Sequence, residues 1–415
     1  MSRRILMVAF HFPPFAGSSG VQRTLRFVRH LPKHGWQPIV LSAQPQAYET
    51  TSPDLLQEVP AGTVVRRAFA LNSARHLAIR GRYLAFTARP DRWISWKFDA
   101  IRQGMALIAQ YRPQLIWSTY PIATAHVIGA ELARRSGLPW VADFRDPMAQ
   151  PGYPADPVTW QQFSAIERRA LEQAALSTFT TPGAVQIYRQ RYPARAERIQ
   201  LLENGYDEES FLAAARQPTH SEPLLPGCLT LLHSGIVYPE ERDPVALFRA
   251  LQQLRERRPQ TRLRICFRAS TQDGLLRHLA ERFKVAGLID LQPALPYADA
   301  LGEMLRADAL LILQAANCNA QIPAKLYEYL RAGRPVVALT DAAGDTAASV
   351  RQAGFDWLAA LDDAAAIAAL LARVEDQLLA GQLPKAHAGF VQQASRAART
   401  AQLAGHLDRL AGVVA

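Results

Sequence analysis

The sequence predicts an α/β protein with two doubly wound, Rossmann-like domains. Three observations support this fold class. The chain has 415 residues, enough for two large domains. Short apolar runs alternate with amphipathic stretches, as in parallel sheets that are covered by helices on both faces. The same rhythm starts again after a segment rich in proline and polar residues, at residues 216–227.

In the first half, strands are expected where near-continuous apolar runs indicate burial on both faces of a sheet. Their ranges are 5–10, 38–42, 115–118, 140–143, 176–180 and 199–202. Helical patterns lie between several of these strands, for example at residues 21–31 and 123–135. The first run stops at His11 after six residues, so we interpret it as a buried strand and not as a signal peptide or a membrane span.

The second half repeats this pattern. Its expected strands are 229–233, 262–267, 288–292, 309–313, 335–339 and 356–358, and its expected helices are 244–256, 273–285, 324–331 and 364–379. We therefore predict an N-terminal domain over residues 1–205, a linker over 206–227 and a second domain over 228–384. One long helical segment is expected within residues 385–415, crossing back to the first domain.

Charge is distributed unevenly along the chain. The net charge is +11, and residues 1–205 hold 25 of the 47 Lys and Arg but only 13 of the 36 Asp and Glu. The first half therefore carries +12, and the remainder carries −1. Such asymmetry points to an anionic partner for the first domain, which could be a membrane surface, a phosphorylated substrate or a nucleic acid.

Cysteine content and hydropathy bear on the cellular compartment in which we expect the protein. The three cysteines, Cys228, Cys266 and Cys318, are too few and too widely spaced for a disulfide framework or a CxxC metal site. No stretch of 18 apolar residues occurs. We expect a cytoplasmic protein that is at most peripheral at the inner face of the cell membrane.

The first motif, HFPPFAGSSGVQR at residues 11–23, follows the first strand directly. Gly17 and Gly20 belong to a small, flexible turn before a helix, where backbone N–H groups can face an anion. The spacing is not GxGxxG, so a dinucleotide fingerprint is not supported. The alternative is an ordinary strand-to-helix turn.

A second motif, PWVADFRDP at residues 139–147, ends a strand in three charges. Charged side chains packed at a strand end destabilise the fold unless they form ion pairs or bind a ligand. Asp143, Arg145 and Asp146 are therefore candidate catalytic residues, with Arg145 and one aspartate touching the acceptor or the donor phosphate. The alternative is a structural Asp–Arg pair that holds the loop.

Two further motifs follow strand ends on either side of the predicted linker. ENGYDEESF, at residues 203–211, indicates mainly hinge geometry, because a tight Asn-Gly turn precedes a residue that can cap a helix. In HSGIVYPEERDP, at residues 233–244, Gly235 permits close approach of a ligand and Arg242 is a candidate to reach a diphosphate. Solvated charge is the alternative for Arg242 and the two glutamates before it.

The most informative motif is NCNAQIPAKLYEYLRAGRPVVAL at residues 317–339. A loop leads to Pro323, which suits the first turn of a helix. Lys325 and Glu328 are three residues apart, so they share one face of that helix. Beside a cleft, Lys325 and the helix N–H groups can hold phosphate while Glu328 accepts ribose hydroxyls. A plain surface Lys–Glu pair is the alternative.

A basic, aromatic segment spans residues 66–97. It interleaves arginines with aromatic residues, namely Arg75, Arg80, Arg82, Arg89 and Arg92 with Phe69, Tyr83, Phe86, Trp93 and Trp96. Such a segment can lie on an anionic membrane, where each basic residue contributes roughly 1 kcal/mol, or stack on nucleic-acid bases. The alternative is a solvated helix with a core-facing aromatic stripe.

Together these motifs resemble glycosyltransferase family 4, especially bacterial members from polysaccharide-assembly systems. The segments FPPFAGSSGVQR, PWVADFRDP, ENGYDEESF and IPAKLYEYLRAGRPVVAL resemble recurring blocks of that family at similar positions, over nearly the whole chain. The resemblance implies a GT-B fold, in which two Rossmann-like domains face a cleft. It also implies a nucleotide-diphosphate sugar donor, retention of the anomeric configuration, and no metal or other cofactor.

The resemblance further implies roles for individual residues. By position, Gly17 and Gly20 line the cleft near the donor phosphates. Arg242 and Lys325 neutralise the diphosphate and so stabilise the leaving group. Glu328 matches the second glutamate of the family's paired-glutamate motif and binds ribose.

Three positions depart from the family pattern. Ala320 stands where the first glutamate of the pair falls, Arg145 where many members carry a histidine near the transferred sugar, and Ile236 where an arginine often follows the glycine. These departures keep open a non-catalytic GT-B-like binding or scaffold protein. A GT-B sugar-nucleotide epimerase is a further alternative within enzymes.

We predict a hexosyltransferase-type glycosyltransferase of polysaccharide biosynthesis. It takes a sugar from a nucleotide-diphosphate donor on the C-terminal domain and passes it to a lipid-linked or saccharide acceptor on the basic N-terminal domain. An anionic membrane surface is a further expected partner, through residues 66–97. A nucleic acid is disfavoured, because no recognised binding module is visible.

Overall fold

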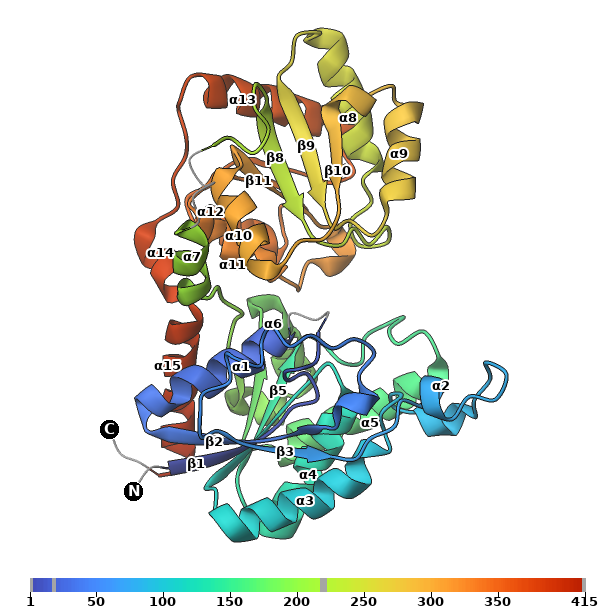
Figure 1. The fold of residues 1–415 in the computed structure, drawn as a ribbon, viewed down its shortest axis with the longest axis vertical. Helices are drawn as coiled ribbons and strands as arrows, with labels where there is room; N and C mark the ends of the chain where they lie inside the picture. Colours follow the sequence, from blue (N-terminus) through green and yellow to red (C-terminus); the bar gives the residue numbers. More distant parts are fainter. Residues whose placement is uncertain (1–2, 17–19, 217–221, 413–415) are drawn as a thin grey trace. The chain divides into compact units, whose positions relative to one another are not determined.

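The structure, a computed structural model, describes residues 3–16, 20–216 and 222–412, which form two compact units (Figure 1). Unit 1 comprises Met1–Asn204 together with Arg396–Ala415, and unit 2 comprises Gly205–Ser395. Each unit is built on one parallel sheet with helices on both faces. The predicted α/β fold with two doubly wound domains is confirmed.

The sheet of unit 1 has seven parallel strands in the order β3-β2-β1-β4-β5-β6-β7. Their bounds are β1 Arg3–Val8, β2 Trp36–Ala43, β3 Val64–Ala68, β4 Leu115–Thr119, β5 Trp140–Arg145, β6 Leu176–Phe179 and β7 Ile199–Leu201. The strand order reverses direction between β1 and β4. Ligands of open α/β sheets bind beyond the carboxyl ends of the strands at such a switch point.

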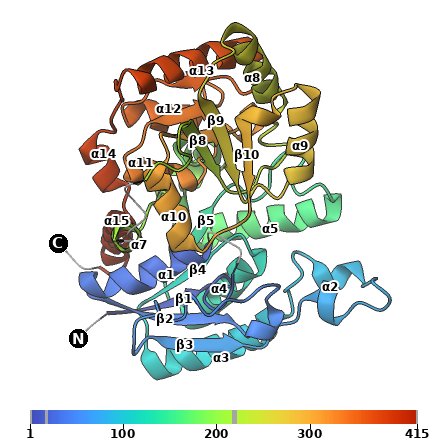
Figure 2. The ribbon, with the colours of Figure 1, turned by 45° about the horizontal axis from the view of Figure 1, so that its top comes forward.

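Helices on the two faces of this sheet bury separate apolar clusters. Figure 2 shows α1 on one side of the sheet and α3 on the other. One face is covered by α1 and α15, and the other by α3, α4, α5 and α6. The bounds are α1 Gly20–His30, α2 Ser73–His76, α3 Trp96–Tyr111, α4 Ala123–Ser136, α5 Pro157–Gln173, α6 Pro182–Arg191 and α15 Arg396–Leu410. The first and last helices of the chain therefore share one layer of unit 1.

Unit 2 has a six-stranded parallel sheet in the order β10-β9-β8-β11-β12-β13, with its switch point between β8 and β11. The strands are β8 Leu229–Ser234, β9 Leu263–Arg268, β10 Ile289–Gln292, β11 Ala309–Leu313, β12 Val336–Leu339 and β13 Leu358–Ala359. As expected from their near-continuous apolar sequences, the central strands are buried on both faces.

Two groups of helices cover the sheet of unit 2. One face carries α8, α9 and α13, and the other carries α7, α10, α11, α12 and α14. The bounds are α7 Glu208–Ala215, α8 Val245–Arg257, α9 Asp273–Arg282, α10 Tyr297–Arg306, α11 Lys325–Ala332, α12 Asp345–Gln352, α13 Ala364–Leu379 and α14 Ala388–Gln393. Of the described helices in both units, none is long and apolar enough to cross a membrane.

The structure differs from the sequence expectation at the ends of unit 2. The predicted linker, residues 206–227, contains helix α7, which packs against α10. The predicted single helix after residue 385 is two helices, α14 and α15, with Ala394 and Ser395 between them. Composition suggested a linker because prolines and polar residues gather at 216–227, but residues 208–215 bury Phe211 and Ala214 in the core.

The basic, aromatic segment 66–97 is not a solvated helix. It starts in β3, forms the single-turn helix α2, and continues mostly without regular structure to the start of α3. Only part of its aromatic content faces the core, because Trp96 is fully buried and Trp93 packs partly against the core. Phe69, Tyr83 and Phe86 are exposed.

Candidate functional site

The four residues predicted to bind the donor in unit 2 lie around the carboxyl end of β8. Gly235 follows this strand with φ +113°, a conformation that L side chains rarely adopt. A Cβ atom at Gly235 would lie 3.1 Å from the Lys325 Nζ. Glycine therefore allows the lysine, from the first turn of α11, to approach the backbone closely.

His233, the penultimate residue of β8, fixes the position of Lys325. Its Nδ1 is 3.0 Å from the carbonyl oxygen of Leu311, and its Nε2 is 3.2 Å from the Lys325 Nζ. Burial, followed by the charge of Lys325, lowers the pKa of His233 well below its usual value. The neutral ring can thus donate to Leu311 through Nδ1 and accept from the ammonium through Nε2. Sequence reasoning missed this role, although His233 opens the HSG motif.

Arg242 and Glu328 complete the cluster around Lys325. Arg242 donates a hydrogen bond to the Ile236 carbonyl, and its guanidinium lies 4.9 Å from the centre of the Tyr238 ring. Burial, and then the charge of Arg242, lower the pKa of Lys325 to well below its usual value. The carboxylate of Glu328 acts in the opposite direction and raises the pKa. The group combines two cations, a glycine and a carboxylate at one sheet edge, which suits a phosphate ester with hydroxyls beside it.

Glu328 is already oriented by a neighbouring helix. The hydroxyl of Tyr297, the first residue of α10, donates to Glu328 Oε1 at 2.8 Å. The N-cap residue of α11 is Ala324, whose side chain makes no capping hydrogen bond. The start of α11 is therefore suited to an anion, and Glu328 is held one turn further on.

A hollow of about 460 Å³ opens along the same edge of the sheet in unit 2. It is lined by Asp243, Val245, Ala246, Arg249, Gln314, Ala315, Ala316, Asp341, Ala360, Leu361 and Asp362. None of the four predicted donor residues lines it. Its three carboxylates would repel phosphate, so the hollow is the poorer place for a diphosphate than the cluster around Lys325.

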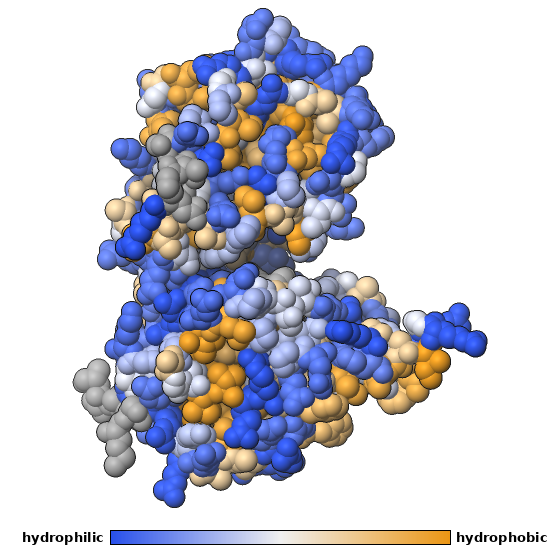
Figure 3. Space-filling model, viewed as in Figure 1, coloured by the Kyte–Doolittle hydropathy of each residue, from blue (hydrophilic) through white to orange (hydrophobic). Residues whose placement is uncertain are grey.

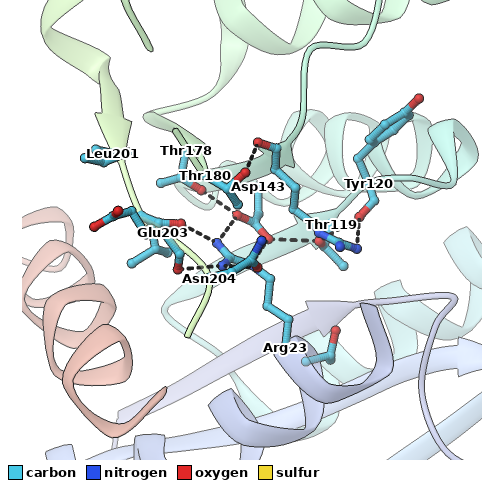
Figure 4. Close-up of polar contacts among 12 residues, drawn as sticks. Arg23, Thr119, Tyr120, Asp143, Thr178, Thr180, Leu201, Glu203 and Asn204 are labelled. Atoms are coloured by element: carbon cyan, nitrogen blue, oxygen red, sulfur yellow. Dashed lines mark hydrogen bonds and ion pairs between the residues drawn. The ribbon is translucent and has the colours of Figure 1, made fainter. Parts of the chain in front are cut away.

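In unit 1, Asp143 lies at the centre of a buried polar network (Figure 4). Arg23 of α1 donates to both carboxylate oxygens, from Nε at 3.0 Å and from Nη2 at 2.8 Å. The hydroxyls of Thr119 and Thr178 add bonds of 2.9 and 2.8 Å from the two neighbouring strands. Burial alone would raise the pKa of Asp143, but Arg23 and the hydroxyl of Thr178 outweigh it and lower the pKa.

This network favours the structural alternative for Asp143. Its carboxylate is fully buried and accepts hydrogen bonds from Arg23, Thr119 and Thr178, so it joins α1 to three strands of the sheet. The structural Asp–Arg pair that we considered is present, but its arginine is Arg23 and not Arg145. Arg23 also donates to the carbonyls of Leu202 and Glu203, so it ties the end of the seven-stranded sheet to α1.

Arg145 and Asp146 occupy the carboxyl end of β5, as the motif predicts. The Arg145 side chain is buried and donates from Nη1 to the Tyr120 carbonyl at 3.4 Å. Asp146 is half-buried and accepts a long hydrogen bond, 3.4 Å, from the hydroxyl of Thr180. Of the two predicted glycines in this unit, Gly20 is the buried first residue of α1, and Gly17 lies outside the described residues.

Comparison with known proteins agrees with this arrangement. Residues 19–205 match the model of the glycosyl transferase 4-like domain family. The matched residues make up most of unit 1. No curated protein matches the chain.

Solved structures agree over the whole chain at low sequence identity. Sucrose-phosphate synthase from Thermosynechococcus elongatus is 15% identical, with a TM-score of 0.63, and the match covers 99% of this chain and 100% of that one. Anabaena HepE in complex with UDP and glucose is 14% identical, with a TM-score of 0.63 and coverage of 98% and 100%. A Listeria monocytogenes protein assigned as a UDP-N-acetylglucosamine 2-epimerase is 13% identical, with a TM-score of 0.58 and coverage of 100% and 98%.

These likenesses establish the GT-B fold, and the family domain supplies the activity. The chain is a glycosyltransferase of the GT-B type. The resemblance to family 4 that the sequence motifs suggested is thereby confirmed.

Proposed function

We propose that this glycosyltransferase takes a sugar from a nucleotide-diphosphate donor bound in unit 2 and passes it to a lipid-linked or saccharide acceptor bound in unit 1. The carrying observation is the cluster of Gly235, Arg242 and Lys325 at the carboxyl end of β8. Two cations beside an uncapped helix start suit a diphosphate, and Glu328 suits the ribose hydroxyls.

The same cluster supports the leaving group during transfer. As the bond between the sugar and the diphosphate breaks, negative charge grows on the departing phosphate, and preorganised cations stabilise it. We propose that transfer occurs with retention of the anomeric configuration and needs no metal, with Arg242 and Lys325 carrying this electrostatic role. Polysaccharide biosynthesis is the pathway class that suits such an activity.

Calorimetric titration with UDP tests the donor site. Anabaena HepE was crystallised with UDP, which makes this nucleotide the first to try. Lys325→Ala should weaken binding roughly 10-fold to 100-fold, because a charge-assisted hydrogen bond is worth about 1.5–3 kcal/mol. Lys385→Ala removes an exposed lysine of the same unit and should leave affinity unchanged. Unchanged UDP affinity in Lys325→Ala would contradict the assignment of Lys325 to the donor site.

Product analysis separates the proposed activity from its alternatives. Incubation with a UDP-sugar should release UDP only slowly by hydrolysis, and faster when a suitable acceptor is present. A sugar-nucleotide epimerase would instead change the sugar stereochemistry while the nucleotide bond stays intact, which nuclear magnetic resonance detects. Nucleotide binding with neither change would indicate the non-catalytic binding or scaffold alternative.

We also propose that unit 1 docks on the anionic cytoplasmic face of the membrane through residues 66–97. Three apolar side chains of this segment are among the most exposed in the protein: Ile79 at 79%, Leu84 at 66% and Phe86 at 71%. Exposed Arg80 and Arg82 lie beside them in sequence. Figure 3 likewise displays apolar and charged surface together on the segment that projects around α2. Apolar insertion and attraction to anionic lipid are the two forces that hold proteins at membrane surfaces.

A further inference from the structure

The guanidinium of Arg145 is a buried charge with little compensation. Arg145 is 9% exposed, and its buried Nε has no hydrogen-bond partner among the described residues. Within the same part of the chain, its side chain makes one hydrogen bond, of 3.4 Å, from Nη1 to the Tyr120 carbonyl. No carboxylate in the described part of the chain lies within ion-pair distance of it. An unpaired buried charge costs stability, so its retention calls for a reason.

The backbone at Arg145 is strained as well. Its φ is +62°, in the left-handed region, and the register between β5 and β6 shifts between Asp143 and Arg145. The amide and the hydroxyl of Thr180 both donate to the Arg145 carbonyl at 2.8 Å, which holds this geometry. Such a conformation is uncommon for a non-glycine residue and is found preferentially at functional sites.

The loop that follows Arg145 is anchored by the buried carboxylate of Glu167. The Ala149 amide donates to Glu167 at 2.9 Å, and the Met148 amide donates to the Tyr188 hydroxyl at 2.9 Å. Tyr188 in turn donates to Glu167, which also pairs with Arg191 at 2.9 Å. Hydrogen bonds from Thr180 to the Arg145 carbonyl, and from the Met148 and Ala149 amides to Tyr188 and Glu167, thus hold the backbone on both sides of Arg145 in place.

The surroundings of the guanidinium leave its charge available. Burial, with the charge of Arg145 as a second cause, lowers the pKa of His11 to about 3, so this ring is neutral. The nearby Arg23 is neutralised by Asp143. Asp146, which is next in sequence and half-buried, and Asp143 both attract the Arg145 guanidinium electrostatically, but neither forms an ion pair with it among the described residues. The charge of Arg145 is therefore only partly offset within unit 1.

We propose that Arg145 binds a phosphate group of the acceptor. This inference rests on the proposed function, in which unit 1 receives the acceptor. A planar guanidinium binds phosphate through paired N–H groups, and the Arg145 Nε forms no hydrogen bond with the described residues. The excess of basic over acidic residues in 1–205, 25 against 13, favours an acceptor of this charge.

Thermal unfolding in inorganic phosphate tests the inference on the full chain, with chloride replacing phosphate at constant ionic strength. Phosphate should raise the Tm of the wild-type protein and of Lys325→Ala, in which the proposed donor site is weakened, and the shift should be clearly smaller in the double variant Arg145→Gln, Lys325→Ala. Equal shifts in Lys325→Ala and in the double variant, or no shift in the wild-type protein, overturn the inference. A shift already lost in Lys325→Ala places the anion in the donor site alone and also overturns it.

A second readout separates a ligand-binding arginine from a structural one. Without phosphate, Arg145→Gln should unfold at or above the wild-type Tm, because the variant removes an unpaired buried charge. Arg23→Gln should unfold several degrees lower, because it leaves Asp143 buried without its partner. A loss of Tm in Arg145→Gln as large as in Arg23→Gln overturns the inference.

Two further measurements complete the test. UDP affinity should be unchanged in Arg145→Gln, so a failed donor site and a failed acceptor site are distinguishable. Glucose 6-phosphate and dodecyl phosphate then separate a phosphosugar acceptor from a lipid phosphate. The ligand that shifts the Tm of the wild-type protein at the lower concentration, and does not shift that of Arg145→Gln, identifies the source of the phosphate.

Discussion

Lys325 sits where its neutral form is favoured. Burial and then Arg242 lower its pKa well below the usual value, and only Glu328 opposes them. His233 accepts from its ammonium but, being neutral, supplies no charge. In the proposed function, the diphosphate of the donor would supply the negative charge that favours the ammonium form of Lys325.

This residue should make nucleotide binding depend on pH. The phosphates favour the ammonium, so binding UDP should take up a proton wherever Lys325 is neutral in the free protein. Because the protonated form binds, affinity should fall as the pH rises through the lowered pKa of Lys325. Calorimetry in buffers of different ionisation enthalpy measures the uptake. Lys325→Arg remains charged and should bind without it, whereas equal uptake in this variant would contradict the assignment.

At the residue scale, local spacing predicted part of the proposed donor site. Lys325 and Glu328 were proposed because a three-residue spacing places two side chains on one helix face. The contacts of His233 were not predicted, because its partners, Leu311 and Lys325, are distant in sequence. The pairing of Asp143 was not predicted for the same reason: its partner Arg23 lies 120 positions away and no local pattern links them.

Among the elements, the segment 66–97 combines a fixed base with an exposed tip. At the base, the Asp91 carboxylate accepts from the backbone amides of Trp93 and Thr124, at 3.0 and 2.8 Å. The Ser73 hydroxyl donates to the carbonyls of Thr87 and Arg92, which closes the segment on itself. An apolar tip on a fixed base can enter a membrane without first being ordered.

Liposome co-sedimentation tests this segment. The triple variant Ile79→Ser, Leu84→Ser and Phe86→Ser should lose most of its binding to vesicles that contain anionic lipid. Burial of each of these apolar side chains in the membrane should contribute roughly 1.5–3 kcal/mol to the free energy of binding. Leu379→Ser, a change at an exposed leucine of unit 2, is the matched control and should bind normally. Full binding by the triple variant, or equal binding to neutral vesicles, would count against membrane docking.

Sequence patterns located most elements but not all of them. Apolar strands such as β8 and β11 were placed within a residue, because burial on both faces leaves a clear signal. The edge strand β3 was missed, since its sequence VVRRA contains two arginines and is only partly buried. Helix α7 was missed because the predicted linker, which the prolines and polar residues of 216–227 indicated, was extended back to residue 206.

For the whole molecule, the key feature is that unit 1 contains both chain ends. Leu403, Ala404 and Leu407 of α15 pack into the same apolar cluster as Leu25 of α1. Asp408 accepts from the Trp36 indole at 2.8 Å and pairs with Arg3. The last helix therefore completes the core of the first domain.

Truncation of a core side chain in α15 should destabilise unit 1 selectively. Leu407→Ala should cost about 2–5 kcal/mol, because it leaves a cavity against the sheet. Hydrogen exchange followed by mass spectrometry should show faster exchange in β1 and β2 and unchanged exchange in β8 and β11. Leu379→Ala, at an exposed site, should change neither unit. Uniform exchange in both units would refute the assignment of α15 to unit 1.

The place of α15 has a consequence for biosynthesis. On the ribosome, β1 and β2 emerge before α15, because the helix that covers part of their α1-side face is made only after all of Gly205–Ser395. At about 5–20 residues per second, this interval lasts roughly 10–40 s. Throughout it, apolar surface around Ile5 and Val40 lacks its final cover, so nascent chains should be substrates for chaperones that hold hydrophobic segments.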